Sequence, residues 1–247
     1  MRWIIALGFF FSDQIPISLD DSKNKMDPLE ILIEPLRHSP LLPVAVKRLQ
    51  MQIADESAQR NQFYGDMSPE QKVEFVDGKI ILHSPARNRH LEVTMYAATL
   101  LRTYVDLQRL GVVRVEKCLC VFPRNDYEPD IVFFGSAKAE ALDASTLKFP
   151  VPDLIVEVLS DSTEKNDRGV KFEDYAANGV AEYWIIDAER STLEQYFLRD
   201  EIYYLEQKSS SGTLTSRVIT GFQVAIESMF DQQANLAAMR AMLAGSE

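Results

Sequence analysis

The sequence predicts an α/β (α+β) fold in which a mixed β-sheet is flanked by helices. Short apolar runs at 131–134, 154–159 and 182–187 are typical of buried strands, and an apolar stripe at helical spacing runs through 88–110. Helical and strand-like segments are interspersed along the chain. With 247 residues, 46% hydrophobic and 26% charged, the chain can bury a sizeable core. This composition excludes a disordered chain, a collagen-like repeat and a polytopic membrane protein.

The first 43 residues are expected to form a variable extension, because prolines from residue 28 onward prevent a long helix there (Pro28, Pro35, Pro40 and Pro43). The apolar run 3–11 is too short to span a bilayer, and no small-residue cleavage site comes after it. We therefore expect a cytoplasmic protein, with a short secretory signal as the alternative. Met26 is a candidate for the true start, because the residues after it are more typical of a folded domain.

A helix is expected over 44–60, from the spacing of its apolar residues. Ser68-Pro69-Glu70-Gln71 has the pattern of a brief helix start, with a capping serine and a proline in the first turn. Asp77-Gly78 lies between the strand-like runs 73–76 and 79–82, which predicts a hairpin. The long helix 88–110 is expected to bury one stripe (Leu91, Met95, Ala98, Leu101 and Val105) and to end at Gly111.

The remaining elements are predicted by the same rules. Strands are expected at 112–115, 119–122, 131–134, 154–159 and 182–187, with a surface excursion over 135–152 and a helix over 166–178. A hairpin is expected over 192–206, and edge strands at 214–219 and 222–226. The last helix, 231–244, carries an apolar stripe that must be buried, either on the chain's own core or against a second copy (Leu236, Met239 and Leu243).

Charge and cysteine content restrict the function. The chain has 26 basic and 37 acidic residues, a net charge of −11, so it has no general attraction for nucleic acid or anionic lipid. Cys118 and Cys120 are too close along an extended chain to form an unstrained disulfide, and we expect reduced thiols. Three histidines and two cysteines make a poor zinc site. No glycine-rich phosphate loop is present, so no nucleotide cofactor is expected.

Two carboxylates occur where buried strands are expected. Asp130 precedes the run 131–134, and Glu157 interrupts the run 154–159. A buried carboxylate must be paired, hydrogen-bonded, neutralised or bound to a cation. Two such acids at the ends of adjacent strands suit Mg²⁺, which binds one or two carboxylates, water and substrate phosphate. Lys171, on the next helix, is placed to orient a water and to stabilise charge on an attacked phosphate.

These residues belong to a longer pattern that resembles the Uma2 family, formerly a domain of unknown function, within the PD-(D/E)xK nuclease superfamily. The resemblance rests on Pro129-Asp130, Pro152-Asp153-Leu154-Ile155-Val156-Glu157-Val158-Leu159-Ser160, Asp167-Arg168-Gly169-x-Lys171 and Gly179-Val180-x-Glu182-Tyr183-Trp184-Ile185-Ile186-Asp187. It extends to Glu74-Phe75-Val76-Asp77-Gly78-Lys79-Ile80 and to His90, and covers residues 62–205.

The resemblance implies a restriction-endonuclease-like domain over 44–226, with 1–43 as an N-terminal extension and 227–247 as a C-terminal helix. It implies Asp130 and Glu157 as metal ligands, with the Val158 carbonyl and Glu74 as further candidates, and Mg²⁺ or Mn²⁺ as the cofactor. The sequence departs from the superfamily pattern at Leu159, where lysine is usual, and Lys171 is expected to replace that lysine. It departs again at Asp161, where the family usually has proline.

A structural role is the alternative for each of these residues. Glu157 can be a structural acid paired with Lys171, and Asp130 can cap a turn after Pro129. Glu74 can be a solvated acid at a hairpin edge, and Lys171 a solvated charge on a helix. His90, at the start of the long helix, is either structural or in contact with substrate or a carboxylate.

The expected function is a Mg²⁺-dependent endonuclease that hydrolyses DNA, with Asp130, Glu157 and Lys171 as catalytic residues. Because the whole molecule repels a polyanion, positive charge must be local. We expect four basic residues to surround the cleft and, with His90, to bind DNA (Arg87, Arg89, Lys165 and Arg168). The alternative is a non-catalytic interaction protein that keeps the nuclease fold, which the net charge favours. Superfamily nucleases often form homodimers, so DNA and a second copy are the expected partners.

Overall fold

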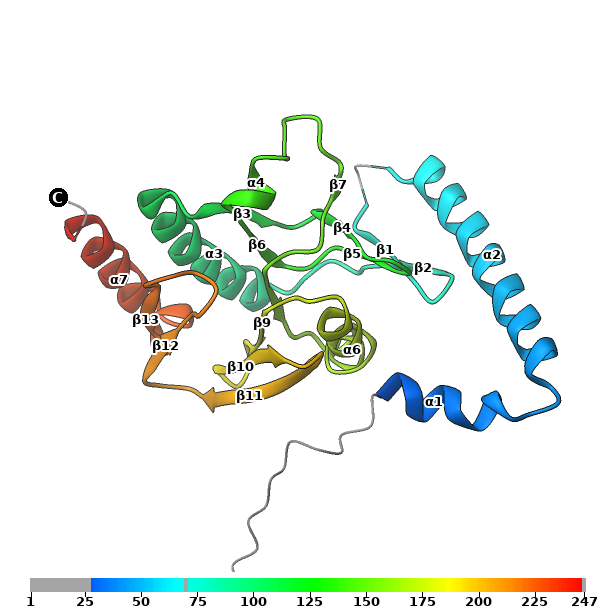
Figure 1. Ribbon diagram of the computed structural model, residues 1–247. Helices are drawn as coiled ribbons and strands as arrows, with labels where there is room; N and C mark the ends of the chain where they lie inside the picture. The colour runs from blue at the N-terminus through cyan, green and yellow to red at the C-terminus, as the bar shows by residue number, and fades with distance from the viewer. Residues whose placement is uncertain (1–27, 69–70, 246–247) are drawn as a thin grey trace, which may run out of the picture. The chain divides into compact units, whose positions relative to one another are not determined.

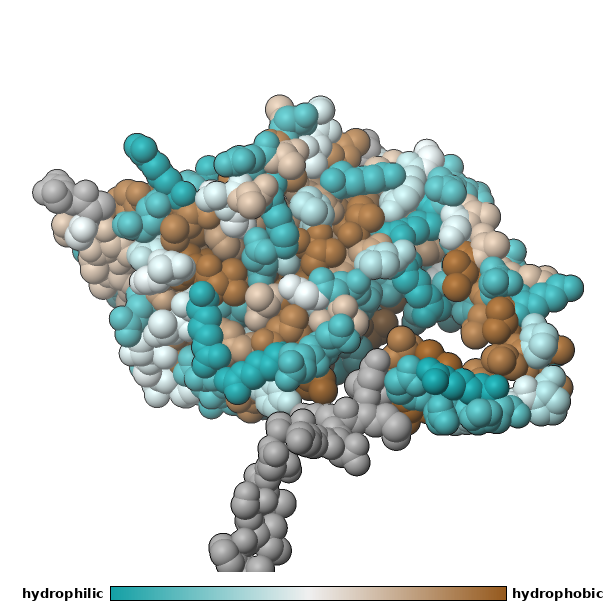
Figure 2. All heavy atoms as spheres, viewed as in Figure 1, coloured by the Kyte–Doolittle hydropathy of each residue, from teal (hydrophilic) through white to brown (hydrophobic). Residues whose placement is uncertain are grey.

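The computed structural model describes residues 28–68 and 71–245 (Figure 1). The chain divides into two units, residues 1–53 and residues 54–247. In the described part of the first unit, α1 (Pro28–Arg37) forms despite Pro35 in its interior, and α2 (Leu42–Asp66) begins there and continues into the second unit. Several apolar side chains of these helices are exposed, such as Leu32 at 72%, and Figure 2 shows apolar residues along them.

A six-stranded sheet forms the centre of the second unit. Its strand order is β11-β10-β9-β8-β6-β3. β8 and β9 are parallel, and the remaining neighbouring pairs of this sheet are all antiparallel. The strands are β3 (Gly111–Val115), β6 (Ile131–Gly135), β8 (Leu154–Val158), β9 (Glu182–Asp187), β10 (Thr192–Arg199) and β11 (Ile202–Ser209). The expected mixed sheet is confirmed, and its central strands are the continuous apolar runs.

A second sheet has five strands in the order β2-β1-β5-β4-β7. Its strands are β1 (Val73–Val76), β2 (Lys79–Leu82), β4 (Leu119–Val121), β5 (Asp126–Tyr127) and β7 (Lys148–Phe149). β1 and β2 form the expected hairpin, with Val76 paired to Lys79. Both turn residues have positive φ, Asp77 at 50° and Gly78 at 73°, as a two-residue primed turn requires.

Helices cover both faces of the six-stranded sheet. One core cluster joins α3 (Asn88–Gln108) to residues of β6, β8 and β9, with α7 (Gln232–Ala244) packed against it. The other joins the opposite faces of these strands to β4, β5 and α6 (Val170–Ala177). The remaining elements are short: α4 (Ser136–Ala139), α5 (Glu164–Asp167), the 3₁₀ helix η1 (Ile226–Met229), and the paired strands β12 (Thr213–Thr215) and β13 (Gln223–Ala225).

The buried face of α3 differs in part from the predicted stripe. Ala98, Leu101 and Val105 are buried as expected, but Leu91 is 47% exposed and Met95 is 62% exposed. The helix buries residues of a neighbouring row instead (Val93, Thr94, Ala97 and Leu100). Apolar residues occur on both rows, so helical spacing alone allowed two rotations, and packing on the sheet and α7 selected one. The helix also ends earlier than predicted, at Arg109 in the left-handed conformation rather than at Gly111.

Other predictions have mixed outcomes. The helix predicted over 166–178 is two helices, α5 and α6, separated at Arg168-Gly169. α7 packs on the chain's own core through Met239 of the predicted stripe and through Met242, whereas Leu243 of that stripe is 51% exposed. The helix start predicted at 68–71 includes residues 69–70, and the start suggested at Met26 precedes 28, so both lie outside the described residues.

Cys118 and Cys120 are free and buried. Within the described residues, no helix combines the length and the apolar character that crossing a membrane requires.

Candidate active site

An open cleft of about 830 Å³ lies in the second unit, where the ends of β6 and β8 meet α3, α6 and the first hairpin. Asp130 immediately precedes β6, and Glu157 is the penultimate residue of β8. The antiparallel register pairs Ile131 with Val156, which brings the two acids side by side at the end of the sheet. Both are almost fully buried, at 4% and 3% exposure. Lys171 also lines the cleft, so the three predicted catalytic residues converge on one site.

Around Lys171 there is a buried group that we call the inner cluster: Glu74, Glu157, Asp167 and Lys171. The Lys171 Nζ lies 2.9 Å from Glu74 Oε1, 3.0 Å from Glu157 Oε1 and 3.4 Å from Asp167 Oδ1. Tyr175, on the same helix as Lys171, also holds Glu157: its hydroxyl donates to Glu157 Oε1 at 2.9 Å. The predicted ligand Glu74 is therefore part of the site, and it is buried rather than solvated.

The break between α5 and α6 turns Lys171 inward. Gly169 lies at this break with φ −117° and ψ −109°, and a Cβ added there would lie 2.7 Å from the Lys165 carbonyl oxygen. That distance is too short for any side chain without a shift of the backbone. Glycine therefore permits the tight connection that places Asp167 and Lys171 on opposite sides of the break but in contact.

Burial and charge act in opposite directions on the carboxyl groups of the inner cluster. Burial raises the pKa of Glu157 to about 8; Lys171 counteracts this in part, while the charges of Asp167 and Asp130 add to it. Burial also raises the pKa of Asp167, against the effect of Lys171. At Glu74 the effect of burial is outweighed by Lys171 and His83, and the pKa falls to about 2. One ammonium therefore serves three carboxyl groups, and negative charge at Glu157 is poorly compensated.

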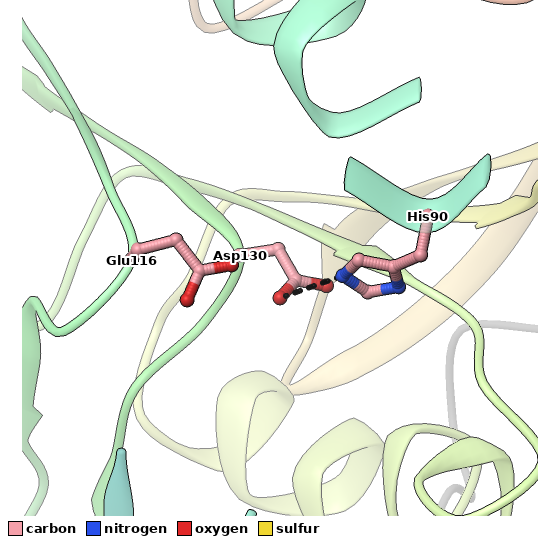
Figure 3. A group of neighbouring side chains, drawn as sticks. All are labelled: His90, Glu116 and Asp130. Carbon is pink, nitrogen blue, oxygen red and sulfur yellow. Dashed lines mark ion pairs between the residues drawn. The ribbon is translucent and has the colours of Figure 1, made fainter. Parts of the chain in front are cut away.

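Next to the inner cluster lies a second group, the outer cluster: Lys72, His90, Glu116 and Asp130. Lys72 Nζ lies 3.0 Å from Asp130 Oδ1 and 3.5 Å from Glu116 Oε2. His90 Nε2 lies 3.5 Å from Asp130 Oδ1, as the dashed line in Figure 3 marks. The other oxygen of Asp130 accepts a hydrogen bond from the Val158 backbone N–H at 2.8 Å. Asp130 thus belongs to the outer cluster and lies beside Glu157 of the inner cluster, because Ile131 pairs with Val156.

The charges of the outer cluster also shift pKa values. Burial would raise the pKa of Asp130, but the partners His90 and Lys72 and the Val158 N–H lower it well below the usual range. Burial would lower the pKa of His90, but Asp130 raises it above the ordinary histidine value. Asp130 is therefore a carboxylate at neutral pH, ready to bind a cation.

The donor groups fit a divalent cation. Carboxylate oxygens of Asp130, Glu157 and Glu74 are the hard ligands that Mg²⁺ and Mn²⁺ bind. Within the described residues the carboxylates are incompletely satisfied: Asp167 is buried and its Oδ1 has only the ion pair with Lys171, at 3.4 Å, and Glu74 Oε2 has only His83 Nε2, at 3.1 Å. Buried acceptors of this kind are expensive unless a cation or a proton compensates them. The Val158 backbone lies beside Asp130, and the role of its carbonyl as a ligand stays a prediction.

The expected ring of basic residues is wrong for three of its four members. Arg87 lines the cleft, but its guanidinium binds Asp161 Oδ2 at 2.7 Å. Arg89 points elsewhere and donates to the carbonyls of Ala188 and Phe230.

Arg168 binds Glu194 through two hydrogen bonds of 2.8 and 2.9 Å, on β10. Lys165 is exposed and does not line the cleft. The reason is local geometry: Arg87 and Arg89 are two residues apart at a helix start and so face different directions, and the short helix α5 turns Arg168 toward β10.

Sequence reasoning missed four residues of the site. Lys72, His83 and Glu116 line the cleft, and Asp167 completes the inner cluster. The spacing of Asp167 and Lys171, four residues apart, was a usable signal for a pair on one helical face. No local pattern marks Lys72 or Glu116, because Lys72 is distant in sequence from both of its partners, Glu116 and Asp130, and reaches them only through folding.

Comparison with known proteins identifies the family and a shared fold. The model of the Uma2 family, described as "Putative restriction endonuclease", matches residues 58–227. An uncharacterized protein of Synechocystis sp., slr1290, is 27% identical over 134 residues, which are 53% of this chain and 68% of that protein. A crystal structure from Anabaena variabilis, titled as a putative nuclease belonging to DUF820, has a TM-score of 0.59 at 17% identity and covers 69% of this chain and 96% of its own. This last likeness shows that the two chains share a fold.

Proposed function

The chain belongs to the Uma2 family, and from that premise we propose that it is a metal-dependent endonuclease that hydrolyses phosphodiester bonds in DNA. The observation that carries the proposal is the meeting of Asp130, Glu157 and Lys171 in one open cleft. Each of them is almost fully buried, and all three are held by hydrogen bonds or ion pairs. A solvated surface acid or lysine would not need such support.

Asp130 and Glu157 would hold Mg²⁺ or Mn²⁺, with Glu74 next to them. When bound, such an ion lowers the pKa of water and neutralises charge on a phosphate. The protein's own groups fix the geometry around that place. The Val158 N–H orients Asp130, and the Tyr175 hydroxyl orients Glu157. Tyr175 is a positioning residue, because it acts through Glu157.

Lys171 supplies the positive charge beside Glu157, as Lys72 does beside Asp130. Its ammonium lies 3.0 Å from Glu157 and lines the cleft. A phosphate that approaches Asp130 and Glu157 would meet this ammonium, which stabilises negative charge that develops on the phosphate oxygens. Because Lys171 is tied to three carboxyl groups, its position is fixed before substrate arrives. We place the protein in the cytoplasm as part of the same proposal.

The proposal is tested by nicking of supercoiled plasmid and cleavage of oligonucleotides in the presence of Mg²⁺ or Mn²⁺. Glu157→Gln is the control, because the amide has nearly the same size and is a poorer ligand. Cleavage that requires the metal and is lost in Glu157→Gln supports the proposal. If the folded wild-type protein cleaves neither duplex nor single-stranded DNA, the second candidate gains, a non-catalytic interaction protein with a nuclease fold. The net charge of −11 favours that second candidate.

A further inference from the structure

We propose that His90, Glu116 and Asp130 form a cation site of their own, which prefers a first-row transition metal ion such as Mn²⁺ to Mg²⁺ or Ca²⁺. One nitrogen of His90 and one carboxylate oxygen from each acid all lie within 4.8 Å of one another. The three side chains come from separate elements: the start of α3, the turn between β3 and β4, and the residue before β6. Figure 3 shows that they converge. The inference concerns metal binding and does not require that the protein cut DNA.

The donor atoms set the preference. The inner cluster offers only carboxylate oxygens, which suit Mg²⁺ and Ca²⁺. The site proposed here adds an imidazole nitrogen, and imidazole favours transition metals over Mg²⁺ and Ca²⁺. Asp130 belongs to both groups of ligands, so the two places are adjacent and differ in the metal that they favour.

Lys72 already places a positive charge at this site. Its ammonium lies 3.0 Å from Asp130 Oδ1 and 3.5 Å from Glu116 Oε2, the two carboxylates of the proposed site. A metal ion and an ammonium cannot occupy the same space between these acids. The Lys72 side chain is 19% exposed and lines the cleft, so a metal ion bound here would have to displace its ammonium toward the cleft. We therefore infer that Lys72 is the counter-ion of the metal-free site and competes with the metal.

The ligands are held in place by the backbone. Glu116 and Lys117 have positive φ, at 44° and 48°, in the tight turn between β3 and β4. The Glu116 N–H donates to the Asp130 carbonyl at 3.2 Å. This bond holds the turn that carries Glu116 against Asp130, the second carboxylate ligand of the proposed site. The Val158 N–H holds one oxygen of Asp130 and leaves the other directed at His90 and Lys72. Such preorganisation lowers the cost of binding a cation.

The test is Mn²⁺ binding to the full chain, measured by electron paramagnetic resonance. Pulsed measurements report nitrogen coupled to bound Mn²⁺. We expect such coupling in the wild type and in Glu157→Gln, and its loss in His90→Gln with affinity lower by about tenfold or more. Lys72→Met should raise the affinity by about tenfold, because a competing charge is removed. His38→Gln, at an exposed histidine of the first unit, should leave both readouts unchanged.

Several outcomes would overturn the inference. Mn²⁺ bound without nitrogen coupling in the wild type would place the ion on carboxylates alone. The inference would also be overturned if His90→Gln bound Mn²⁺ with the affinity and nitrogen coupling of the wild type, or if the wild type bound no Mn²⁺. If His90→Gln fails to fold, Glu116→Gln replaces it, and there the affinity should fall by about tenfold while the nitrogen coupling persists. DNA cleavage is not among the readouts, so a failure of the nuclease proposal leaves this result interpretable.

Discussion

Replacing Lys171 with methionine should destabilise the protein strongly, and more so at high pH. Lys171 is 2% exposed and is the ammonium that serves Glu74, Glu157 and Asp167, at 2.9, 3.0 and 3.4 Å. Methionine has a similar length and keeps the apolar packing, so the variant removes mainly the charge. It leaves three buried carboxyl groups without that partner.

The magnitude is set by the burial. Removing one partner of a buried ion pair costs about 3–5 kcal/mol, because the other charge is left uncompensated. For a domain of this size each kcal/mol lowers the melting temperature by about 2–4 °C, so we expect a decrease of roughly 6–20 °C. Lys171 lowers the pKa of Glu157 and Asp167, so without it both pKa values rise further. Acids with a raised folded pKa destabilise the fold above their unfolded pKa, and the loss therefore shrinks as the pH falls toward the ordinary carboxyl range.

Urea denaturation of the wild type and Lys171→Met, at several pH values between about 5 and 8, measures this difference. Lys165→Met is the matched control, because Lys165 is an exposed lysine of the preceding short helix, and its loss should change stability by less than about 0.5 kcal/mol. A Lys171→Met protein as stable as the wild type at pH 8, or a deficit that grows as the pH falls, would refute the reasoning about the inner cluster.

Three other substitutions test the site and the charges around it. Glu157→Gln should abolish metal-dependent cleavage, while the circular dichroism spectrum and the melting temperature stay close to those of the wild type. The reason is that the amide removes a buried charge and a metal ligand without a change of shape. Activity near the wild-type level would exclude Glu157 from the mechanism. At Glu194 the effect of burial is outweighed by Arg168, and the pKa falls from 4.5 to about 2. The ionised Glu194 should therefore stabilise the fold fully above about pH 4.5, and this stabilisation should be lost toward pH 2. Glu194→Gln should lower the urea midpoint at pH 7 but not at pH 2, and equal midpoints at pH 7 would contradict this. Asp161→Asn should strengthen DNA binding about two- to fivefold, because it releases the exposed Arg87 from its ion pair. With Arg87 as a single phosphate contact, the affinity for DNA should fall only about 3.5-fold from 50 to 200 mM salt. A fall of two orders of magnitude would show that more basic residues reach the DNA.

Much of the fold is predictable from local patterns in the sequence. Asp77-Gly78 predicts the β1–β2 hairpin, because a two-residue primed turn needs positive φ at both positions and these residues accept it. The runs 131–134, 154–159 and 182–187 predict central strands, because strands covered on both faces are apolar at nearly every position. Such signals depend on a few neighbouring residues, and they survive in the three-dimensional structure.

Where two patterns compete, the sequence does not choose. On α3 two rows of apolar residues satisfy helical spacing, and only packing on the sheet decides that Val93 and Leu100 are buried while Met95 is exposed. A continuous helix over 166–178 fits the sequence as well as two helices do. The close approach of Gly169 to the Lys165 carbonyl separates them, and that contact exists only in the folded chain.

The sequence by itself determined the kind of chemistry at the site. Asp130 and Glu157 stand in strands that had to be buried, and a buried carboxylate requires a cation, a donor or a proton, so a charged site was predictable from those two positions. Only the tertiary structure decided which partners meet them. It brings Lys72, His90 and Glu116 to Asp130, and it turns Arg89 and Arg168 away from the cleft. The physical reason is that a continuous apolar run marks a covered strand within a few neighbouring residues, whereas electrostatic partnership depends on distances between atoms that lie far apart in the chain, and these are fixed only when the sheets and helices pack.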